Sequence, residues 1–134
     1  MGKAAAKSGD KITGSDTHSV ELTGTTTIQQ QPSLPFAGAI ASGLSSNVRI
    51  NSQFAAVVGS GADNDPPHSS DLGSLVPPPS NKGSVFSGSA TVKINSKAAA
   101  RHGDKATTCN EPPTPGNGQV EVADAATATV CFGD

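Results

Sequence analysis

The sequence predicts an all-β fold in which short strands form a cone or β-prism with pseudo-threefold symmetry. Three observations predict it: a motif that recurs three times, an alternation of apolar and polar residues within it, and residues typical of turns at its ends. Long segments rich in proline and glycine are expected to link the repeats as loops. The length of 134 residues fits a single domain that spans residues 1–134.

The repeat is clearest in two stretches that align without a gap. Residues 48–60 (Val-Arg-Ile-Asn-Ser-Gln-Phe-Ala-Ala-Val-Val-Gly-Ser) match residues 92–104 (Val-Lys-Ile-Asn-Ser-Lys-Ala-Ala-Ala-Arg-His-Gly-Asp) at an offset of 44 residues. In a third copy, residues 129–133 supply the first half and residues 3–10 the second half. A unit that is divided in this way implies a closed ring with adjacent termini. The three repeats are expected to cover approximately residues 118–134 together with 3–32, residues 36–82, and residues 83–117.

Strand positions within the repeat predict which side chains form the core. Successive side chains of a strand point to opposite faces, so Val92 and Ile94 are expected to share one face and Lys93 to lie on the other. An alanine pair follows in each copy, where three sheets would approach too closely for larger side chains. The predicted core contains two threefold layers (Val48, Val92 and Val130; Ile50, Ile94 and Phe132) and three alanine pairs (Ala5 with Ala6, Ala55 with Ala56, Ala99 with Ala100).

The alanine runs also have a helical alternative, because alanine is the best helix former. Each run has five residues or fewer before a Gly-Asp or Gly-Ser turn, which is too short for a stable helix. Short strands are therefore preferred. The rest of the chain is expected to be surface loop, in particular the polar, proline-containing residues 29–35, 61–80 and 110–117.

The composition is lean in large apolar residues and excludes several classes of protein. Valine, isoleucine, leucine and phenylalanine make up 24 of the 134 residues, which allows either a disordered chain or a small core supplemented by another source of stability. The repeat favours the fold. No apolar stretch has the length of a transmembrane helix or a signal peptide. A net charge of −2 and the lack of a basic cluster argue against nucleic acid as a partner.

Three candidate metal ligands fall into register when the copies are aligned on their turns. His18 lies eight residues after Asp10, and His68 lies eight residues after Ser60. Cys109 lies five residues after the turn of the remaining copy. Three loops related by a pseudo-threefold axis should converge on it, and imidazole and thiolate ligands suit zinc, with iron as the lesser alternative. One ion per chain is expected, and it would add the stability that a small core lacks.

Each of these polar residues also has a simpler interpretation. Isolated histidines and cysteines in proline-rich loops are usually surface residues, and no spacing here forms a compact zinc motif. His102 directly precedes a turn, so it is either a solvated surface residue or the fourth ligand. Cys131 aligns with the outward-facing Lys93, which predicts a free thiol. A Cys109–Cys131 disulfide is the minor alternative.

Motifs for catalysis are missing from the sequence, so no catalytic residue is predicted and the protein is not expected to be an enzyme. The sequence has no Gly-x-Ser-x-Gly, no phosphate-binding loop and no His-Glu-x-x-His. Asp10 and Asp104 follow turn glycines, and Ser60 replaces them in the third copy, which fits a role in capping backbone N–H groups. Glu21 and Glu111 lie near the predicted ligand loops, but no motif places either of them.

The repeat resembles a known family. Residues 98–104 (Ala-Ala-Ala-Arg-His-Gly-Asp), together with Cys109 and the preceding residues 88–95, resemble the Pro-Ala-Ala-Arg repeat of the PAAR family, with Ala98 where the motif has proline. The resemblance covers nearly the whole chain and is weakest in the loops. Three further segments resemble a longer PAAR-like subgroup: residues 9–18, 64–68 and 79–83.

The resemblance implies a spike tip of a contractile injection machine, such as a type VI secretion system, a phage tail or a tail-like particle. The base of the cone would cap a trimeric β-helical spike protein of the VgrG type, one tip per trimer, and the tip would pierce the target cell envelope. Residues that contact the spike are not indicated. Assembly in the producing cell's cytoplasm and outward delivery are implied, and effector cargo is left open.

The family's metal site, generally zinc held by three histidines and one cysteine, maps onto His18, His68 and Cys109. The subgroup tends to carry a further histidine near residues 34–36, where this sequence has leucine. The fourth ligand is therefore open among His102, a water and a group other than histidine.

Two other functions compete with the spike tip. A small zinc metallohydrolase would keep an exchangeable water on its metal. A fragment of a repetitive β adhesin would bind no metal and would associate end to end.

Overall fold

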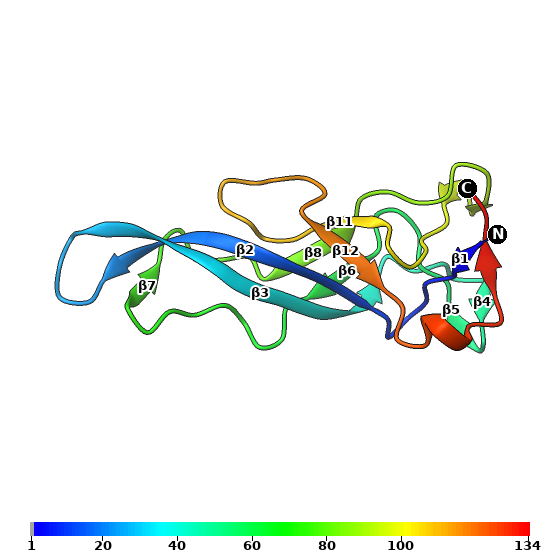
Figure 1. Ribbon diagram of the computed structural model, residues 1–134, viewed down its shortest axis with the longest axis horizontal. Helices are drawn as coiled ribbons and strands as arrows, with labels where there is room; N and C mark the ends of the chain where they lie inside the picture. The colour runs from blue at the N-terminus through cyan, green and yellow to red at the C-terminus, as the bar shows by residue number, and fades with distance from the viewer. Residues whose placement is uncertain (1) are drawn as a thin grey trace.

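The computed structural model describes residues 2–134 and is all-β, as the sequence predicts (Figure 1). These residues contain no α-helix, and one 3-10 turn, η1 (Ala125–Thr127), precedes the last strand. Within the same residues, no helix has the length and apolar character needed to cross a membrane. The strands are β1 (Lys3–Ala4), β2 (Lys11–Leu22), β3 (Ile28–Ser42), β4 (Arg49–Ile50), β5 (Gln53–Phe54), β6 (Gly61–Asp63), β7 (Gly73–Leu75), β8 (Lys82–Val85), β9 (Lys93–Ile94), β10 (Lys97–Ala98), β11 (Lys105–Thr107), β12 (Gly118–Glu121) and β13 (Cys131–Phe132).

Six of these strands close into an antiparallel barrel. Around the barrel the strands follow the order β12, β11, β8, β6, β3 and β2. The ring closes because β2 also pairs with β12. β7 pairs with the other end of β2, beyond the barrel. The sequence analysis did not predict a closed barrel, because the closing pair joins segments more than 100 residues apart and leaves no local pattern.

The longest strands, β2 and β3, form a hairpin that contradicts the expectation of short strands throughout. β2 pairs with β3 from Lys11 opposite Ala39 to Glu21 opposite Ile28 (Figure 1). The strand pattern in β2 is hidden because two of its buried positions carry Asp16 and His18 in place of apolar residues. Alternation of polarity therefore fails to report the alternation of burial.

Residues 29–35, expected as loop, lie within β3. Proline cannot donate to a strand ladder and is confined to edges, first positions and bulges. In residues 2–134, β2 is the only strand paired with this part of β3, since β6 joins β3 only at Ile40 and Ser42. Pro32 and Pro35 are compatible with a strand here because one edge of it is free.

The other two expected loops differ in outcome. Residues 61–80 contain β6 and β7, so that expectation is wrong in part. Residues 110–117 form no strand and are a loop, as predicted.

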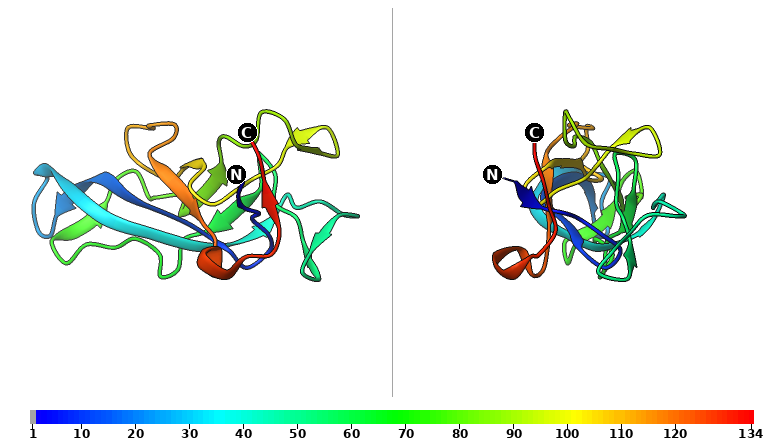
Figure 2. Two further views of the ribbon diagram at one scale, coloured as in Figure 1. Left: turned by 45° about the vertical axis from the view of Figure 1, so that its right-hand side comes forward. Right: turned by 90° about the vertical axis from the view of Figure 1, so that its right-hand side faces the viewer.

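Three two-stranded sheets, two of them hairpins, lie at the end of the molecule that holds the termini (Figures 1 and 2). They pair β4 with β5, β9 with β10, and β1 with β13. The last of these joins the two ends of the chain, with Lys3 opposite Phe132, so the termini are adjacent as predicted. β4 and β5, like β9 and β10, are joined by an Asn-Ser turn whose two residues have positive φ.

Next to these small sheets, three alanines are linked by a closed ring of three backbone hydrogen bonds. The N–H of Ala6 donates to the carbonyl of Ala100, that of Ala100 to Ala56, and that of Ala56 to Ala6, each with an N–O distance of 3.0 Å. The three residues occupy the same place in the three copies of the repeat. Such close backbone approach leaves no room for side chains larger than alanine.

The core consists of two clusters that meet at the alanine pairs. The barrel cluster contains Ala6, Ala56 and Ala100 with larger residues such as Phe36 and Ile12. The hairpin-end cluster contains Ala5, Ala55 and Ala99 with Ile50 and Ile94. All six predicted alanines are buried, as the sequence analysis expected, whereas the predicted valine layer and Phe132 are only partly buried: Val48, Val92, Val130 and Phe132 pack against the hairpin-end cluster.

The turn after each alanine run is capped by a side chain. Asp104 accepts a hydrogen bond from the N–H of the residue three positions before it, with an N–O distance of 2.8 Å, and Asp10 does the same at 3.0 Å. Ser60 caps the third turn with its hydroxyl at 3.0 Å. The predicted capping role of the two aspartates is confirmed.

Candidate metal centre

Four buried side chains meet just beyond the last strand pairs at one end of the barrel: Asp16, His18, His68 and Cys109. Each offers one ligand atom, and these atoms all lie within 4.8 Å of one another. Asp16, His18 and Cys109 are at most 7% exposed, and the side chain of His68 is 3% exposed although its backbone is more accessible. The barrel thus brings together the three histidine and cysteine ligands predicted from the sequence and adds an aspartate.

The two residues from β2 reach the site because they are two positions apart. Side chains at such a spacing lie on the same face of a strand, so Asp16 and His18 both point to the buried side of β2. Their register on β3 shifts between them: Asp16 lies opposite Leu34 and His18 opposite Gln31. Two residues of β3, Pro32 and Ser33, thus face the single Thr17 of β2, and Ser33 has a φ of 61°. Bulges of this kind re-aim side chains and are frequent beside functional sites.

His68 reaches the site from the segment between β6 and β7 and is held there by two asparagines. Its backbone N–H donates to Oδ1 of Asn81 at 2.8 Å, and its ring Nδ1 lies 3.2 Å from Nδ2 of Asn64. With Nδ1 turned toward Asn64, Nε2 of His68 faces the cluster. Edge-on packing of the ring against Phe36, with centroids 6.3 Å apart, fixes its position further.

Cys109 follows β11, and its sulfur lies between the aspartate and a histidine. Sγ is 3.4 Å from Oδ2 of Asp16 and 3.7 Å from Nε2 of His18. The imidazoles of His18 and His68 are stacked at a tilt, with centroids 5.1 Å apart. The cluster therefore offers two nitrogens, one sulfur and one carboxylate oxygen, a donor set that zinc accepts.

Burial and hydrogen bonding set the protonation of these groups. Burial, and then the carboxylate of Asp16, raises the pKa of the Cys109 thiol to about 11. Burial also lowers the pKa of His18, with a further contribution from His68, so its imidazole is neutral near pH 7, the form that binds metal. Burial opposes ionisation of Asp16, but hydrogen bonds from Thr108, His68, Cys109 and Asn117 outweigh it and lower the pKa of the carboxyl.

One feature of the protein side chains favours a bound ion. Nδ1 of His18 is a buried nitrogen with no hydrogen-bond partner within residues 2–134, and its Nε2 has only the distant sulfur of Cys109. A buried imidazole without good partners costs free energy, since it has lost its hydrogen bonds to water. A metal ion bound at Nε2, the nitrogen that faces the cluster, would give this ring one strong partner, while Nδ1 would still have none among the described residues. The residues present therefore fit a metal ion.

His102, the predicted candidate for a fourth ligand, lies outside this group. It lies in the turn between β10 and β11, where its Nδ1 accepts a hydrogen bond from the N–H of Val122 at 3.1 Å. His18 was also expected in a loop but lies in β2. Cys131 is exposed and both cysteines are free, so the predicted free thiol is confirmed and the disulfide alternative is wrong.

Asp16 is the member of the site that the sequence analysis missed. The available signal was the spacing Asp16-x-His18, which places both side chains on one face if the segment is a strand. That signal was lost because the segment was interpreted as loop. His18 was found from the repeat alone, without regard to its secondary structure.

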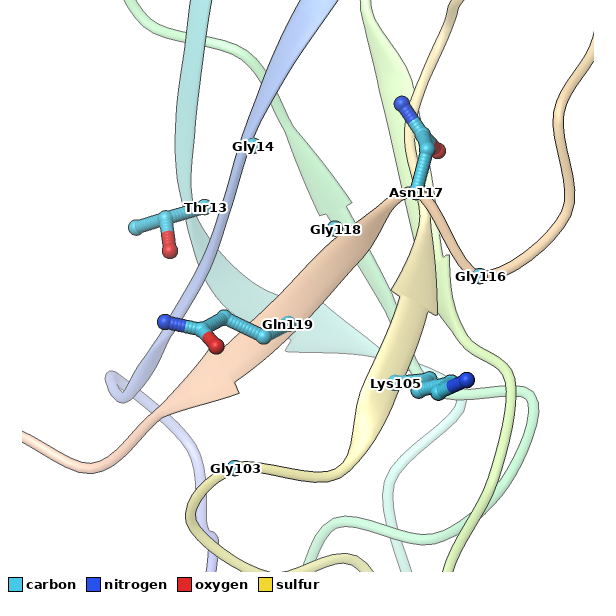
Figure 3. Close-up of a pocket in the computed structure, with 8 residues that line it drawn as sticks. All are labelled: Thr13, Gly14, Gly103, Lys105, Gly116, Asn117, Gly118 and Gln119. Carbon is cyan, nitrogen blue, oxygen red and sulfur yellow. The ribbon is translucent and has the colours of Figure 1, made fainter.

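A separate groove lies on the outer surface of β2, β11 and β12 (Figure 3). Its lining residues are Thr13, Gly14, Gly103, Lys105, Gly116, Asn117, Gly118 and Gln119. Lys105 is the one charged residue among them, and none of the four cluster residues lines it.

Comparison with known proteins gives no match: no family model, no curated protein and no solved structure matches this chain.

The affinity of this site for zinc is expected to rise with pH. Near neutral pH the thiol of Cys109, with its pKa of about 11, is protonated in the metal-free protein and must lose that proton on binding. Release of one proton makes the apparent association constant rise by about tenfold per pH unit between pH 7 and 9. Chelator-buffered zinc titrations measure this slope, with Cys131→Ala as the control that should keep it. An affinity independent of pH would contradict binding through the Cys109 thiolate.

Proposed function

We propose that this protein is a metal-stabilised spike tip, which caps the trimeric central spike of a contractile injection machine and pierces the target cell envelope. The observation that carries the proposal is the ring of backbone hydrogen bonds among Ala6, Ala56 and Ala100, next to the three two-stranded sheets. A single chain with three similar faces around one axis is suited to meet three identical chains. The sequence resemblance to the PAAR family supports the same function.

The hairpin end is the proposed base of a pseudo-threefold cone. Each of the three small sheets has only two strands, and among the described residues the outer strands β4, β9 and β13 pair with no further strand. An exposed edge can be extended by a strand from another chain, which supplies main-chain hydrogen bonds. A trimeric β-helical spike of the VgrG type would present one such edge per subunit. The β2–β3 hairpin, which reaches away from the termini, is the proposed point (Figure 1).

The proposed role of the metal, zinc with one ion per chain, is to join three distant segments of the barrel. His18, His68 and Cys109 belong to β2, the segment after β6 and the segment after β11. A bound zinc ion would cross-link these three segments and so add to the free energy of unfolding. The proposed localisation follows from the machine: assembly in the producing cell's cytoplasm, then delivery at the tip of the particle.

The decisive experiment mixes the purified protein with a trimeric β-helical spike protein from the same source and measures the mass of the complex. One tip per three spike chains is expected by native mass spectrometry, and the tip alone should be a monomer. A spike truncated at its blunt end serves as the control and should not bind. Lack of a complex with the intact spike, or end-to-end association of the tip alone, would contradict the proposal.

A further inference from the structure

The carboxylate of Asp16 is held in one orientation by groups outside the cluster. Its Oδ1 accepts hydrogen bonds from the hydroxyl of Thr108 and from Nδ2 of Asn117, the latter at 3.1 Å. Asn117 is itself fixed, because its Oδ1 accepts the backbone N–H of Thr108 at 3.0 Å. With Oδ1 occupied in this way, Oδ2 is left to face the other three cluster residues.

Oδ2 lies among the ligand atoms of the other three residues. It is 2.8 Å from Nε2 of His68 and 3.4 Å from Sγ of Cys109, whose sulfur is 3.7 Å from Nε2 of His18. A carboxylate with one oxygen held by the protein and the other directed at nitrogen and sulfur donors has the arrangement of a ligand that binds a metal through one oxygen.

Charge also favours a cation at this point. Asp16 is 1% exposed, and within residues 2–134 it forms no ion pair with lysine or arginine; its one close basic partner is His68. A buried carboxylate without a compensating charge is costly. A divalent cation bound by this carboxylate and by the thiolate of Cys109 would make the site electrically neutral, which lowers the cost of burying it.

We propose that Asp16 is the fourth metal ligand, through Oδ2, and that it completes a closed site of two nitrogens, one sulfur and one oxygen. This inference rests on the metal role in the proposed function, but not on binding to a spike. With four protein ligands, no coordination position of a tetrahedral ion remains for water.

The competing role for Asp16 is that of a partner that only orients His68. In that role Nε2–H of His68 donates to Asp16, and the ring could ligate only through Nδ1. Outer partners of this kind are worth about 10–100-fold in metal affinity. In that case the metal would have three protein ligands and an exchangeable fourth position. The two roles differ in the number of protein ligands on the metal and in whether a small anion can bind to it. Both can be measured.

The test uses cobalt(II) as a spectroscopic probe for the metal. The wild-type protein should give the absorption of a four-coordinate site with a sulfur ligand, and added azide should not change it. Asp16→Ala should open one position, so that azide alters the spectrum. Asp16→His should restore a closed site, since imidazole can take the place of the carboxylate. Azide binding to the cobalt form of the wild-type protein would overturn the proposal.

Zinc affinity provides a second readout with a matched control. Asp16→Asn should lower the affinity by more than the roughly 100-fold limit of an outer partner. Glu111→Gln, which removes another carboxylate near His18 but outside the cluster, should leave it within about twofold. Loss of about 100-fold or less in Asp16→Asn would overturn the proposal.

Two further outcomes keep the test decisive. Should Asp16→Ala fail to fold, X-ray absorption of the wild-type zinc form decides: three nitrogen or oxygen ligands and one sulfur, unchanged by azide, support Asp16, and a spectrum changed by azide overturns it. The result is also separate from the spike experiment. A closed site in a protein that binds no trimer sustains this inference while the proposed function fails.

Discussion

Replacing Cys109 by alanine is expected to abolish stoichiometric zinc binding and to lower the melting temperature by roughly 10–20 °C. The sulfur is the one soft donor of the cluster, and a ligand bound to the native state stabilises it by about 4 kcal/mol when its free concentration is 1,000 times Kd. Elemental analysis and thermal unfolding of the same preparations measure both effects.

The chain offers a matched control for this experiment. Cys131→Ala is the same substitution at an exposed, free cysteine, and it should change stability by less than about 0.5 kcal/mol. A chelator should bring the wild-type protein down to the melting temperature of Cys109→Ala and leave that variant unchanged. Full metal content in Cys109→Ala would contradict the site.

Replacing Ala56 by leucine is expected to destabilise the protein by about 3 kcal/mol or more, since overpacking a filled core typically costs about 1–3 kcal/mol and occasionally more. Ala56 is fully buried, and its backbone is hydrogen-bonded both to Ala6 and to Ala100 at 3.0 Å. A larger side chain must force these three segments apart and break the ring of hydrogen bonds. Chemical denaturation measures the change in the free energy of unfolding.

The comparison for this variant is Ala39→Leu, at an exposed position of β3. It adds the same atoms where there is open space, so a change within about 0.5 kcal/mol is expected. Equal loss in the two variants, or no loss in Ala56→Leu, would show that the alanines are not in close contact in solution.

Local patterns predicted those features of the fold that depend on nearby residues. The alternation in residues 92–95 predicted a short strand there, and the Gly-Asp turns predicted the capping by Asp10 and Asp104. The alanine pairs were predicted as sites of close packing because every copy of the repeat keeps them small. Each of these inferences needs only a few consecutive residues and their periodicity.

Hydrophobic patterns failed to predict the strands where the buried side chains are polar residues of the metal site. β2 turns Asp16 and His18 inward, so its polar residues looked like those of a loop, although they are among the most buried in the protein. In β3, Pro32 and Pro35 argued against a strand, and only the lack of a second partner strand makes them compatible with one.

By itself, the sequence determined the all-β class, the repeat, the adjacent termini, and the choice of His18, His68 and Cys109 as residues that belong together. Only the tertiary structure decided that β2 and β12 close a barrel, that Asp16 and not His102 joins the cluster, and that His18 lies on a strand. The reason is physical. A repeat and a turn depend on residues that are close in the sequence. Burial of the Asp16 carboxylate depends instead on partners about 100 positions away, such as Thr108 and Asn117, and those contacts form only once the barrel has closed.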